Sequence, residues 1–252
     1  MSKVVAIIQA RMGSARLPGK TLAKILDQPM IDILLSRVCE SKRIHQIVVA
    51  TTTEQRDNIL YDHLSLNEKI RIFRGSEDDL LDRYYQCALL YKADVIVRIT
   101  ADDPLKDAEI IDEAIELFEQ KQPLDYCSNC LEASYPEGLD VKVFSFDALE
   151  KAFKNAVLPS EREHLTPYIT NNPSIFRLHN FRYKDDLSNW RWTVDKPEDL
   201  DFVRFIFKNF KNDLNVSYKD VIKYCLKNPE IVAINQGTIR FEGYWKTVNE
   251  KD

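Results

Sequence analysis

The chain has 252 residues, which suffices for one large α/β core or for two small domains. Its net charge of −5 argues against non-specific binding to nucleic acid or to a membrane surface. No apolar run approaches the ~20 residues that cross a bilayer, and residues 1–10 lack the layout of a signal peptide. The five cysteines are an odd number and lie mostly in apolar stretches, so we expect reduced thiols and a cytoplasmic protein.

The strongest local signal lies near the amino terminus, where an apolar run is followed by a basic loop. Residues 4–8 are apolar without a break, which is typical of a strand buried on both faces of a parallel sheet. Open α/β folds bind ligands beyond the carboxyl ends of such strands. The loop at this point contains three cations and two glycines, namely Arg11, Arg16, Lys20, Gly13 and Gly19. Cationic side chains and closely approaching backbone N–H groups suit a polyphosphate.

Two other interpretations of this loop remain open. A P-loop has four residues between its glycines, whereas five residues separate Gly13 from Gly19. Pro18 also removes an N–H group that the phosphate cradle of a P-loop would use. The other interpretation is a surface loop that is basic by chance. We predict a phosphate-binding loop of a different type.

Helices and strands alternate over the next fifty residues. We expect a helix at 30–41, a strand at 47–51 and a second helix at 55–65. Thr51 ends the strand, and its hydroxyl is placed either to contact a base or ribose or to cap the following helix. Both interpretations stay open at this stage.

A short strand at 70–73 comes next, and polar residues follow its carboxyl end. Ser76 precedes three acidic residues, which favour the positive end of a helix. We therefore predict that Ser76 is the N-cap of a helix that runs to about Tyr91. Arg74 and Ser76 would then face the ligand cleft.

The most strand-like run of the chain, residues 94–100, is followed by the adjacent aspartates Asp102 and Asp103. Two neighbouring carboxylates are costly to place together without a cation. Mg²⁺ would satisfy them while bridging phosphate oxygens. Alternatively, one of the two caps a helix at 107–119.

The second half of the chain repeats this alternation. A turn and a strand are expected within 135–144, and a helix with Ser160 as its N-cap follows. A strand at 190–194 leads to Asp195, after which Pro197 opens another helix at its first position. Asp195 thus resembles Asp102 in following a strand.

The last segments complete the predicted fold. We expect a helix at 217–227, an edge strand at 229–234, and an aromatic, charged tail that packs on a neighbouring subunit or across the cleft. The alternation of strands and helices predicts a three-layer α/β/α sandwich with a mostly parallel, Rossmann-like sheet. Residues 1–234 would form one domain, residues 235–252 the tail, and the chain a homodimer.

A long stretch of this sequence matches a known family. Residues 7–20, Ile-Ile-Gln-Ala-Arg-Met-Gly-Ser-Ala-Arg-Leu-Pro-Gly-Lys, resemble the opening signature of the cytidylyltransferases of the spore-coat-polysaccharide type. That family shares a superfamily with the synthetases of CMP-activated sialic acid-like sugars and of CMP-Kdo. Further matches follow in the same order, at 74–84, 98–105, 135–144, 162–168 and 193–200.

The resemblance implies a fold of the nucleotide-diphospho-sugar transferase type and a Mg²⁺-dependent reaction. CTP and a sugar acid, nonulosonate- or Kdo-like, would give a CMP-sugar and pyrophosphate for surface polysaccharide or glycan synthesis. In related synthetases a carboxylate two residues before Pro104 binds the metal, which points to Asp102, although the family usually has an uncharged residue in place of Asp103. The aspartate of their V-D-x-P-E-D-L element is the second metal ligand, and here it is Asp195.

The loop pattern and the resemblance together define an expected site. The expected catalytic residues are Arg11, Lys20, Asp102 and Asp195. The expected nucleotide-binding residues are Gln9, Ala10, Arg11, Gly13, Ser14, Arg16, Lys20, Thr51, Arg74, Gly75, Ser76 and Asp102. The expected acceptor-binding residues are Glu137, Asp140, Arg162 and His164.

The acceptor-binding residues have plain structural interpretations as well. Glu137 and Asp140 would meet sugar hydroxyls, or would be polar residues of a half-exposed strand. Arg162 suits a carboxylate or a phosphate, because a guanidinium pairs with such groups through two hydrogen bonds. A lone histidine such as His164 is more often a structural hydrogen-bonding residue than a catalyst.

Three alternative functions remain. One is a sugar-1-phosphate nucleotidylyltransferase that uses another nucleoside triphosphate, since the signature does not fix the base. Another is a metal-dependent glycosyltransferase on a similar fold, although Asp102-Asp103-Pro104 lacks the D-x-D spacing that such enzymes use. The last is a binding domain without activity, against which the intact set of basic and acidic residues argues.

Overall fold

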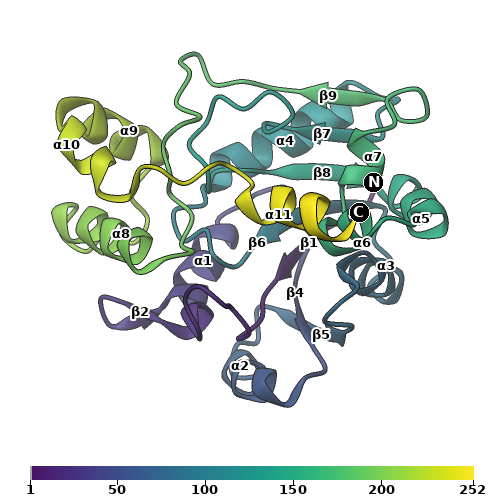
Figure 1. The fold of residues 1–252 in the computed structure, drawn as a ribbon, viewed down its shortest axis with the longest axis horizontal. Coiled ribbons are helices and arrows are strands. Elements are labelled where there is room, and N and C mark those ends of the chain that lie inside the picture. The colour runs from purple at the N-terminus through teal and green to yellow at the C-terminus, as the bar shows by residue number, and fades with distance from the viewer. Residues whose placement is uncertain (1) are drawn as a thin grey trace.

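The computed structural model describes residues 2–252, and these residues fold around one large sheet (Figure 1). Within them the sheet has seven strands in the order β5-β4-β1-β6-β8-β7-β9. The strand bounds are β1 Val4–Gln9, β4 Gln46–Thr52, β5 Arg71–Gly75, β6 Val95–Thr100, β7 Tyr126–Ser128, β8 Lys142–Ser145 and β9 Leu178–Asn180. Every pairing is parallel except the two that β8 makes with β6 and β7. The predicted, mostly parallel sheet is confirmed.

The central strand β1 contributes to two cores, because successive strand residues point to opposite faces. Val4, Ala6 and Ile8 belong to the core on one face, and Val5 and Ile7 to the core on the other. Burial on both faces is the physical reason for the unbroken apolar run at this point of the sequence.

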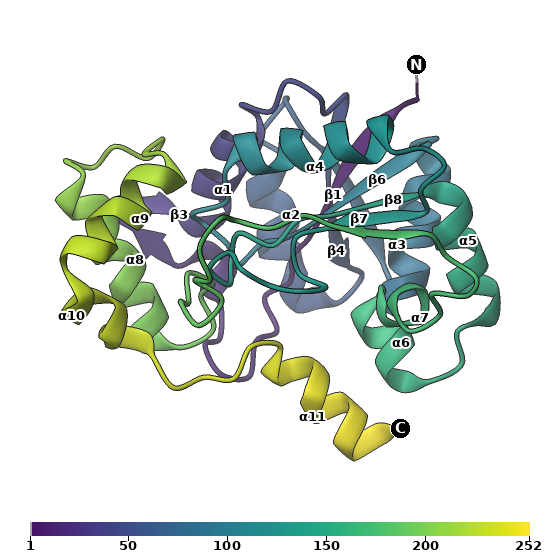
Figure 2. The ribbon, with the colours of Figure 1, turned by 90° about the horizontal axis from the view of Figure 1, so that it is seen from above.

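Helices cover both faces of the sheet, so the predicted three-layer sandwich is also confirmed (Figure 2). One face packs against α1 (Met30–Val38), α2 (Asn58–Leu64), α4 (Ala108–Gln120) and α8 (Pro197–Asn209). The other packs against α3 (Leu80–Leu90), α5 (Phe146–Asn155) and α7 (Pro167–Thr170). The short α6 (Pro159–His164) packs on α3. A separate hairpin is formed by β2 (Lys24–Ile25) and β3 (Gln28–Pro29), just after the 3₁₀ turn η1 (Lys20–Leu22).

The carboxyl-terminal segment first forms a group of helices at one end of the molecule and then returns to the sheet. This group contains α8, α9 (Tyr218–Lys227), α10 (Pro229–Val232) and the 3₁₀ turn η3 (Ala233–Asn235). The predicted edge strand at 229–234 is therefore wrong. Ile231 and Val232 are adjacent in sequence and both buried. Adjacent side chains of an edge strand with one exposed face would point to opposite sides, whereas a helical turn can bury both.

The tail ends in α11 (Glu242–Lys251), which packs against α6 and crosses the molecule in front of the carboxyl ends of β1 and β6 (Figures 1 and 2). The tail was expected either on a neighbouring subunit or across the cleft, and in the structure it lies across the cleft of its own chain. The homodimer stays a prediction, and so does the division at residue 235. Within residues 2–252, no helix is both long enough and apolar enough to cross a membrane.

Two helices begin later or earlier than predicted. Ser76 is not the N-cap of α3: its hydroxyl accepts a hydrogen bond from the Asp79 N–H in a turn before the helix, and the Asp79 carboxylate accepts one from the Asp82 N–H. Ser160 lies inside α6, which begins at Pro159. Predicted helix 55–65 consists of a 3₁₀ turn (η2, Gln55–Asp57) followed by α2.

The predicted strand at 190–194 is present only as an isolated bridge between Glu137 and Arg191. The segment runs close to the turn at Gly138, where the Trp192 N–H donates to the Glu137 carbonyl at 2.7 Å. Gly138 has a φ of +107°, and a Cβ there would lie 2.7 Å from the Trp192 carbonyl carbon, so only glycine permits this approach. A little further on, the Val194 N–H donates to the Asp102 carbonyl at 2.8 Å. This contact brings Asp195 to the end of β6 without a full strand.

Candidate active site

The loop after β1 and the segment after β6 line a cavity of about 680 Å³, the first cavity. Helix α11 forms its opposite wall. A second cavity of about 560 Å³ adjoins it and is lined by β6, β8, the turn at residues 137–140, the end of α6 and the segment around Phe241. Both cavities are lined by Arg16, Thr100, Asp102, Asp195 and Gly243. The two aspartates therefore lie where the cavities meet.

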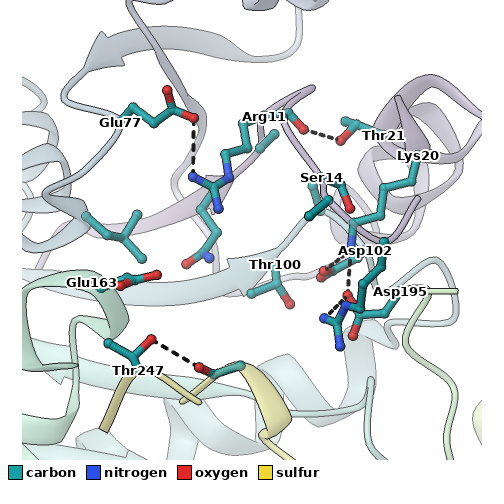
Figure 3. A pocket seen from close by; sticks show the side chains of 18 of the residues that line it. Arg11, Ser14, Lys20, Thr21, Glu77, Thr100, Asp102, Glu163, Asp195 and Thr247 are labelled. Atoms are coloured by element: carbon teal, nitrogen blue, oxygen red, sulfur yellow. Dashed lines mark hydrogen bonds and ion pairs between the residues drawn. The ribbon is translucent and has the colours of Figure 1, made fainter. Parts of the chain in front are cut away.

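Lys20 joins these two aspartates. Its Nζ lies 2.7 Å from Asp102 Oδ2 and 2.8 Å from Asp195 Oδ1, and it also donates to the Val194 carbonyl at 2.8 Å (Figure 3). Burial alone would lower the pKa of Lys20, but the two carboxylates outweigh it and the net pKa is raised. Lys20 thus stays charged, and the structure brings together Asp102 and Asp195, the two residues that the resemblance implies as metal ligands.

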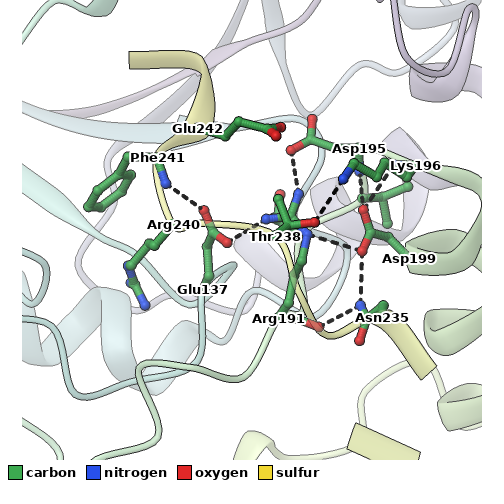
Figure 4. Close-up of polar contacts among 12 residues, drawn as sticks. Glu137, Arg191, Asp195, Lys196, Asp199, Asn235, Thr238, Arg240, Phe241 and Glu242 are labelled. Atoms are coloured by element: carbon green, nitrogen blue, oxygen red, sulfur yellow. Dashed lines mark hydrogen bonds and ion pairs between the residues drawn. The ribbon is translucent and has the colours of Figure 1, made fainter. Parts of the chain in front are cut away.

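A buried arginine that sequence analysis missed holds Asp195 in place. Arg191 donates from Nη2 to Asp195 at 2.6 Å, from Nη1 to Glu137 at 2.5 Å and from Nε to Asp199 at 3.1 Å (Figure 4). The Asp195 carboxylate is also 2.9 Å from Arg16 Nη2. Burial acts to raise the pKa of Asp195, yet Lys20, Arg16 and Arg191 together lower it.

Asp199 is an acidic residue in the first turn of α8 and binds backbone N–H groups there. It accepts hydrogen bonds from the backbone N–H groups of Asp195 and Lys196, each at 2.9 Å, at the start of α8. Glu137 is less well compensated, because burial raises its pKa to about 7 despite the contact with Arg191. Arg191 therefore serves three carboxylates with one guanidinium.

The other cations of the loop after β1 are also paired with carboxylates. Arg11 lies 3.4 Å from Glu77, and both lie to the left of Lys20 in Figure 3. Arg16 pairs with Glu242 of α11 as well as with Asp195. The loop itself is fixed by the Met12 N–H, which donates to Asp57 at 2.6 Å.

Eight of the expected nucleotide-binding residues line the first cavity. They are Gln9, Ala10, Arg11, Gly13, Ser14, Arg16, Lys20 and Asp102. Arg83 of α3 also lines it and was missed by sequence analysis. It is buried, burial lowers its pKa, and its Nε and Nη1 have no hydrogen-bond partner among residues 2–252. The signal was an arginine at a position on the apolar, buried face of α3.

The structure does not bring the remaining four, Thr51, Arg74, Gly75 and Ser76, into either cavity. Thr51 is fully buried. The Arg74 guanidinium is occupied by the carbonyls of Thr52 and Glu54, at 2.7 and 3.0 Å, and so ties β5 to the end of β4. Ser76 is used in the turn before α3. Glu77, one residue further on, reaches the first cavity instead.

Of the expected acceptor-binding residues, Glu137, Asp140 and His164 line the second cavity. Asp140 pairs with Arg240 of the tail. His164 shares a hydrogen bond of 2.9 Å with Thr247 of α11. Burial lowers the pKa of His164 to about 4, and nearby cations add to this effect, so the ring is neutral at pH 7.

Arg162 does not line either cavity, which corrects its expected role. Its guanidinium pairs with Asp79, donates to the Phe153 carbonyl at 3.0 Å, and lies over the Phe153 ring. These contacts fasten α6 to the start of α3. Arg162 is an anchor between helices, and its partner is 83 positions away in sequence.

Asp102 and Asp103, the two adjacent aspartates after β6, have different contacts. Asp103 is buried, accepts a hydrogen bond from the Thr100 hydroxyl at 2.5 Å, and pairs with Lys106 at 3.1 Å. Asp102 instead points to Lys20 at the junction of the cavities. The helix cap that either aspartate might have supplied comes from Asp107, which accepts from the Glu109 N–H.

The donor set of Asp102 and Asp195 fits a hard cation, because two carboxylates already converge on one positively charged atom. Among residues 2–252 there is no group of three or more His, Cys, Asp or Glu side chains that could hold a metal ion. A Mg²⁺ ion here would therefore take its remaining ligands from phosphates and water, as this ion commonly does.

Comparison with known proteins places this chain in a family. The family described as Cytidylyltransferase matches residues 5–239. An uncharacterised protein of Methanocaldococcus jannaschii is 41% identical over 244 residues, which is 96% of this chain and 98% of the relative. The spore coat polysaccharide biosynthesis protein SpsF of Bacillus subtilis is 32% identical over 91% of this chain and 97% of its own length.

One further relative and one solved structure agree with this family. A 3-deoxy-manno-octulosonate cytidylyltransferase of Geobacter metallireducens is 33% identical over 120 residues, 45% of this chain and 43% of that protein. The solved structure of a cytidylyltransferase from Leptospira borgpetersenii serovar Hardjo-bovis superposes with a TM-score of 0.89 at 36% identity, covering 95% of this chain and all of that one. The family match extends over most of the chain, and this chain belongs to the cytidylyltransferase family.

Proposed function

We propose that this protein transfers CMP from CTP to a hydroxyl of a sugar acid and releases pyrophosphate. The observation that carries the proposal is the meeting of two cavities at Asp102 and Asp195. A nucleotide in the first cavity and an acceptor in the second would bring their reacting atoms together there. The names of the relatives support a sugar acid and a role in polysaccharide synthesis.

The reaction needs charge neutralisation more than it needs a protein base. The acceptor oxygen attacks the α-phosphorus in line, a new P–O bond forms, and the bond to pyrophosphate breaks. Arg11, Arg16 and Lys20 would hold the triphosphate and the departing pyrophosphate. These three cations would do so by exchanging carboxylate partners for phosphate oxygens.

Asp102 and Asp195 would hold Mg²⁺ together with the substrate phosphates. When bound, the ion would neutralise phosphate charge and lower the pKa of the attacking hydroxyl. Arg191 would keep Asp195 ionised and in a fixed orientation, since it donates directly to that carboxylate at 2.6 Å. His164 is a poor candidate for a general base, because its pKa of about 4 leaves it a weak proton acceptor.

The first test is a thermal-shift series with CTP, UTP, GTP and ATP, each with Mg²⁺. A ligand at 100 times its Kd adds about 2.7 kcal/mol, which corresponds to roughly 5–10 °C for a chain of this size. A shift confined to CTP supports the proposal and justifies a pyrophosphate-release assay with sugar acids. Release that requires a sugar-1-phosphate and another nucleotide would instead establish the runner-up, a sugar-1-phosphate nucleotidylyltransferase.

A further inference from the structure

Two cations lie directly opposite one another in the wall of the second cavity. Arg98 of β6 pairs in register with Lys142 of the antiparallel strand β8, so both side chains leave the same face of the sheet. Both line the second cavity. Like charges in directly opposed positions destabilise a sheet. This arrangement therefore calls for a compensating anion.

The protein does not supply that anion. Five carboxylates line the second cavity, and each is already paired with a cation elsewhere. The pairs are Asp102–Lys20, Asp103–Lys106, Glu137–Arg191, Asp140–Arg240 and Asp195–Lys20. Among residues 2–252, neither Arg98 nor Lys142 has a carboxylate within ion-pair distance.

The remaining contacts of the two cations fix their positions without neutralising them. Arg98 donates from Nε to Gln9 Oε1 at 3.0 Å and from Nη1 to the His164 carbonyl at 2.8 Å. Lys142 Nζ lies 5.5 Å from the centre of the Phe241 ring and forms no hydrogen bond within the described part of the chain. Burial lowers the pKa of Lys142, and Arg98 contributes to the shift. An unpaired, mostly buried ammonium is costly to the fold.

We propose that Arg98 and Lys142 form the binding site for the carboxylate of the acceptor sugar. This inference rests on the proposed function. It assigns the binding of the acceptor's carboxylate to Arg98 and Lys142 instead of Arg162, which forms an ion pair with Asp79 between two helices. A guanidinium offers a planar pair of donors and an ammonium a point charge, and a carboxylate accepts from both. The same cavity reaches Asp102 and Asp195, so an acid held here keeps its hydroxyls near the α-phosphate position.

The test compares Lys142→Met, which keeps the length of the side chain and removes its charge, with Lys142→Arg, which restores a charge. Lys151→Met removes an exposed lysine from α5 and serves as the matched control. Each protein is melted alone, with CTP and Mg²⁺, and with 3-deoxy-manno-octulosonate, N-acetylneuraminate, pyruvate or inorganic phosphate. Pyrophosphate release is measured with the two sugar acids.

We expect Lys142→Met alone to melt at or above the wild-type temperature, because it relieves the repulsion with Arg98. Its apparent Kd or KM for the preferred acid should rise roughly tenfold to a hundredfold, the usual loss for a hydrogen bond to a charged group. The shift with CTP should be unchanged. Lys142→Arg should recover most of the acid binding, and Lys151→Met should match wild type.

Four outcomes would overturn the inference. They are an unchanged response of Lys142→Met to the acid, a marked loss of its stability without ligand, a wild-type protein that responds to none of the four anions, and a response to inorganic phosphate alone. The last would indicate a phosphorylated acceptor. If Lys142→Met does not fold, the methyl ester of the preferred acid tests the wild-type protein: equal binding of ester and acid would sink the inference.

The same data separate this inference from the proposed function. Lys142-dependent binding of an acid without pyrophosphate release from CTP would retain the anion site and reject cytidylyl transfer. Pyrophosphate release that is unaffected by Lys142→Met would retain the transfer and reject the site.

Discussion

The first and second cavities meet at the same two aspartates but differ in how their charges are balanced. In the first cavity the loop cations Arg11, Arg16 and Lys20 are all paired with carboxylates of the protein. In the second the carboxylates are paired and two cations are left over. The loop cations of the first cavity must therefore give up ion pairs to bind an anion, although Arg83 beside them is unpaired within residues 2–252. Among the described residues, Arg98 and Lys142 in the second cavity have no ion pairs to give up.

This difference separates two ways of preparing a site for a charged ligand. Internal ion pairs stabilise the loop of the first cavity when no nucleotide is bound, but the protein carboxylates then compete with the nucleotide phosphates for the loop cations. Unbalanced cations make the second cavity costly to fold but ready to bind. Substitutions of cations in the two cavities should therefore change stability in opposite directions.

The largest effect is expected for Asp195→Asn, which removes charge where the cavities meet. We expect pyrophosphate release to fall about 10³-fold, because one of two carboxylates proposed to hold the metal is lost. Binding of CTP should change little, since the loop cations remain. Asp201→Asn, on the exposed side of α8, is the control and should keep full activity. Near-normal pyrophosphate release by Asp195→Asn would show that the two-carboxylate site is wrong.

Lys20→Ala tests the self-balanced character of the first cavity. Loss of the ammonium leaves Asp102 and Asp195 facing each other, so the protein without ligand should lose about 1–3 kcal/mol of unfolding free energy. The Kd for CTP should rise roughly tenfold to a hundredfold. Millimolar Mg²⁺ alone should raise the melting temperature of this variant more than that of wild type.

Lys24→Ala provides the control for Lys20→Ala, because this exposed lysine lies just outside the loop. It should leave stability, CTP binding and the response to Mg²⁺ unchanged. A Lys20→Ala protein that is as stable as wild type would contradict the ion-pair account of the first cavity. If Mg²⁺ has no extra effect on it, the two carboxylates do not form a cation site.

Much of this arrangement could be predicted from the sequence. The central strands are buried on both faces, so β1 appears as a continuous apolar run and β6 as an apolar run broken by Arg98, which no amphipathic helix would show. Residues that directly follow such strands lie at one edge of the sheet, which is why Asp102 and the loop cations were expected together. Asp195 came from the resemblance, because its segment is extended but is not a strand of the sheet.

Other features depend on contacts between distant segments. Arg191 meets Glu137 across 54 positions, and Arg162 meets Asp79 across 83. No local pattern says whether an arginine will find a buried carboxylate or a ligand. Arg98 did leave a signal, since it interrupts an otherwise apolar central strand, where an unexplained charge points to a partner or a ligand.

The short apolar run at 229–234 shows a different limit. Four to six apolar residues fit either a buried strand or one helical turn, and periodicity cannot decide between them. Pro229 begins α10 at its first turn, where its missing N–H costs nothing. The tail helix α11 was likewise beyond local prediction, because its place is set by contacts with α6 and with the loop cation Arg16.

A smaller effect is expected from pH, through His164 in the second cavity. Its folded pKa of about 4 lies below the ordinary 6.5, so the unfolded chain takes up the proton first as pH falls. The stability contributed by neutral His164 should therefore be complete above pH 6.5 and decline toward pH 4. Between pH 6.5 and pH 4, the unfolding free energy of His164→Gln should therefore fall by roughly 1–3 kcal/mol less than that of wild type. The measurement is urea unfolding at several pH values.

The comparison with His164→Gln is needed because other groups titrate in the opposite sense. The raised pKa values of Glu137, about 7, and Asp103, about 6, contribute stability that is present at low pH and is lost as pH rises. Only the difference between variant and wild type isolates the histidine. A difference that is constant from pH 4 to 7 would mean that burial and the nearby cations do not hold His164 neutral.

The smallest effect concerns the pair between Arg16 and Glu242, through which the tail closes over the first cavity. Both side chains are more than a third exposed, so the pair contributes no more than about 1 kcal/mol. Glu242→Gln should free Arg16 for phosphate and lower the Kd for CTP by roughly twofold to fivefold. The measurement is a calorimetric titration of CTP with Mg²⁺.

Glu250→Gln removes the same charge from the same helix and the same cavity, and is therefore the matched control. Within the part of the chain that the structure describes, Glu250 has no ion-pair partner. If both variants tighten CTP binding equally, the gain comes from the general potential of the cavity. Weaker binding by Glu242→Gln would mean that the tail positions Arg16 for the nucleotide. Tightening confined to Glu242→Gln would mean that the tail competes with phosphate for Arg16, as the balanced first cavity predicts.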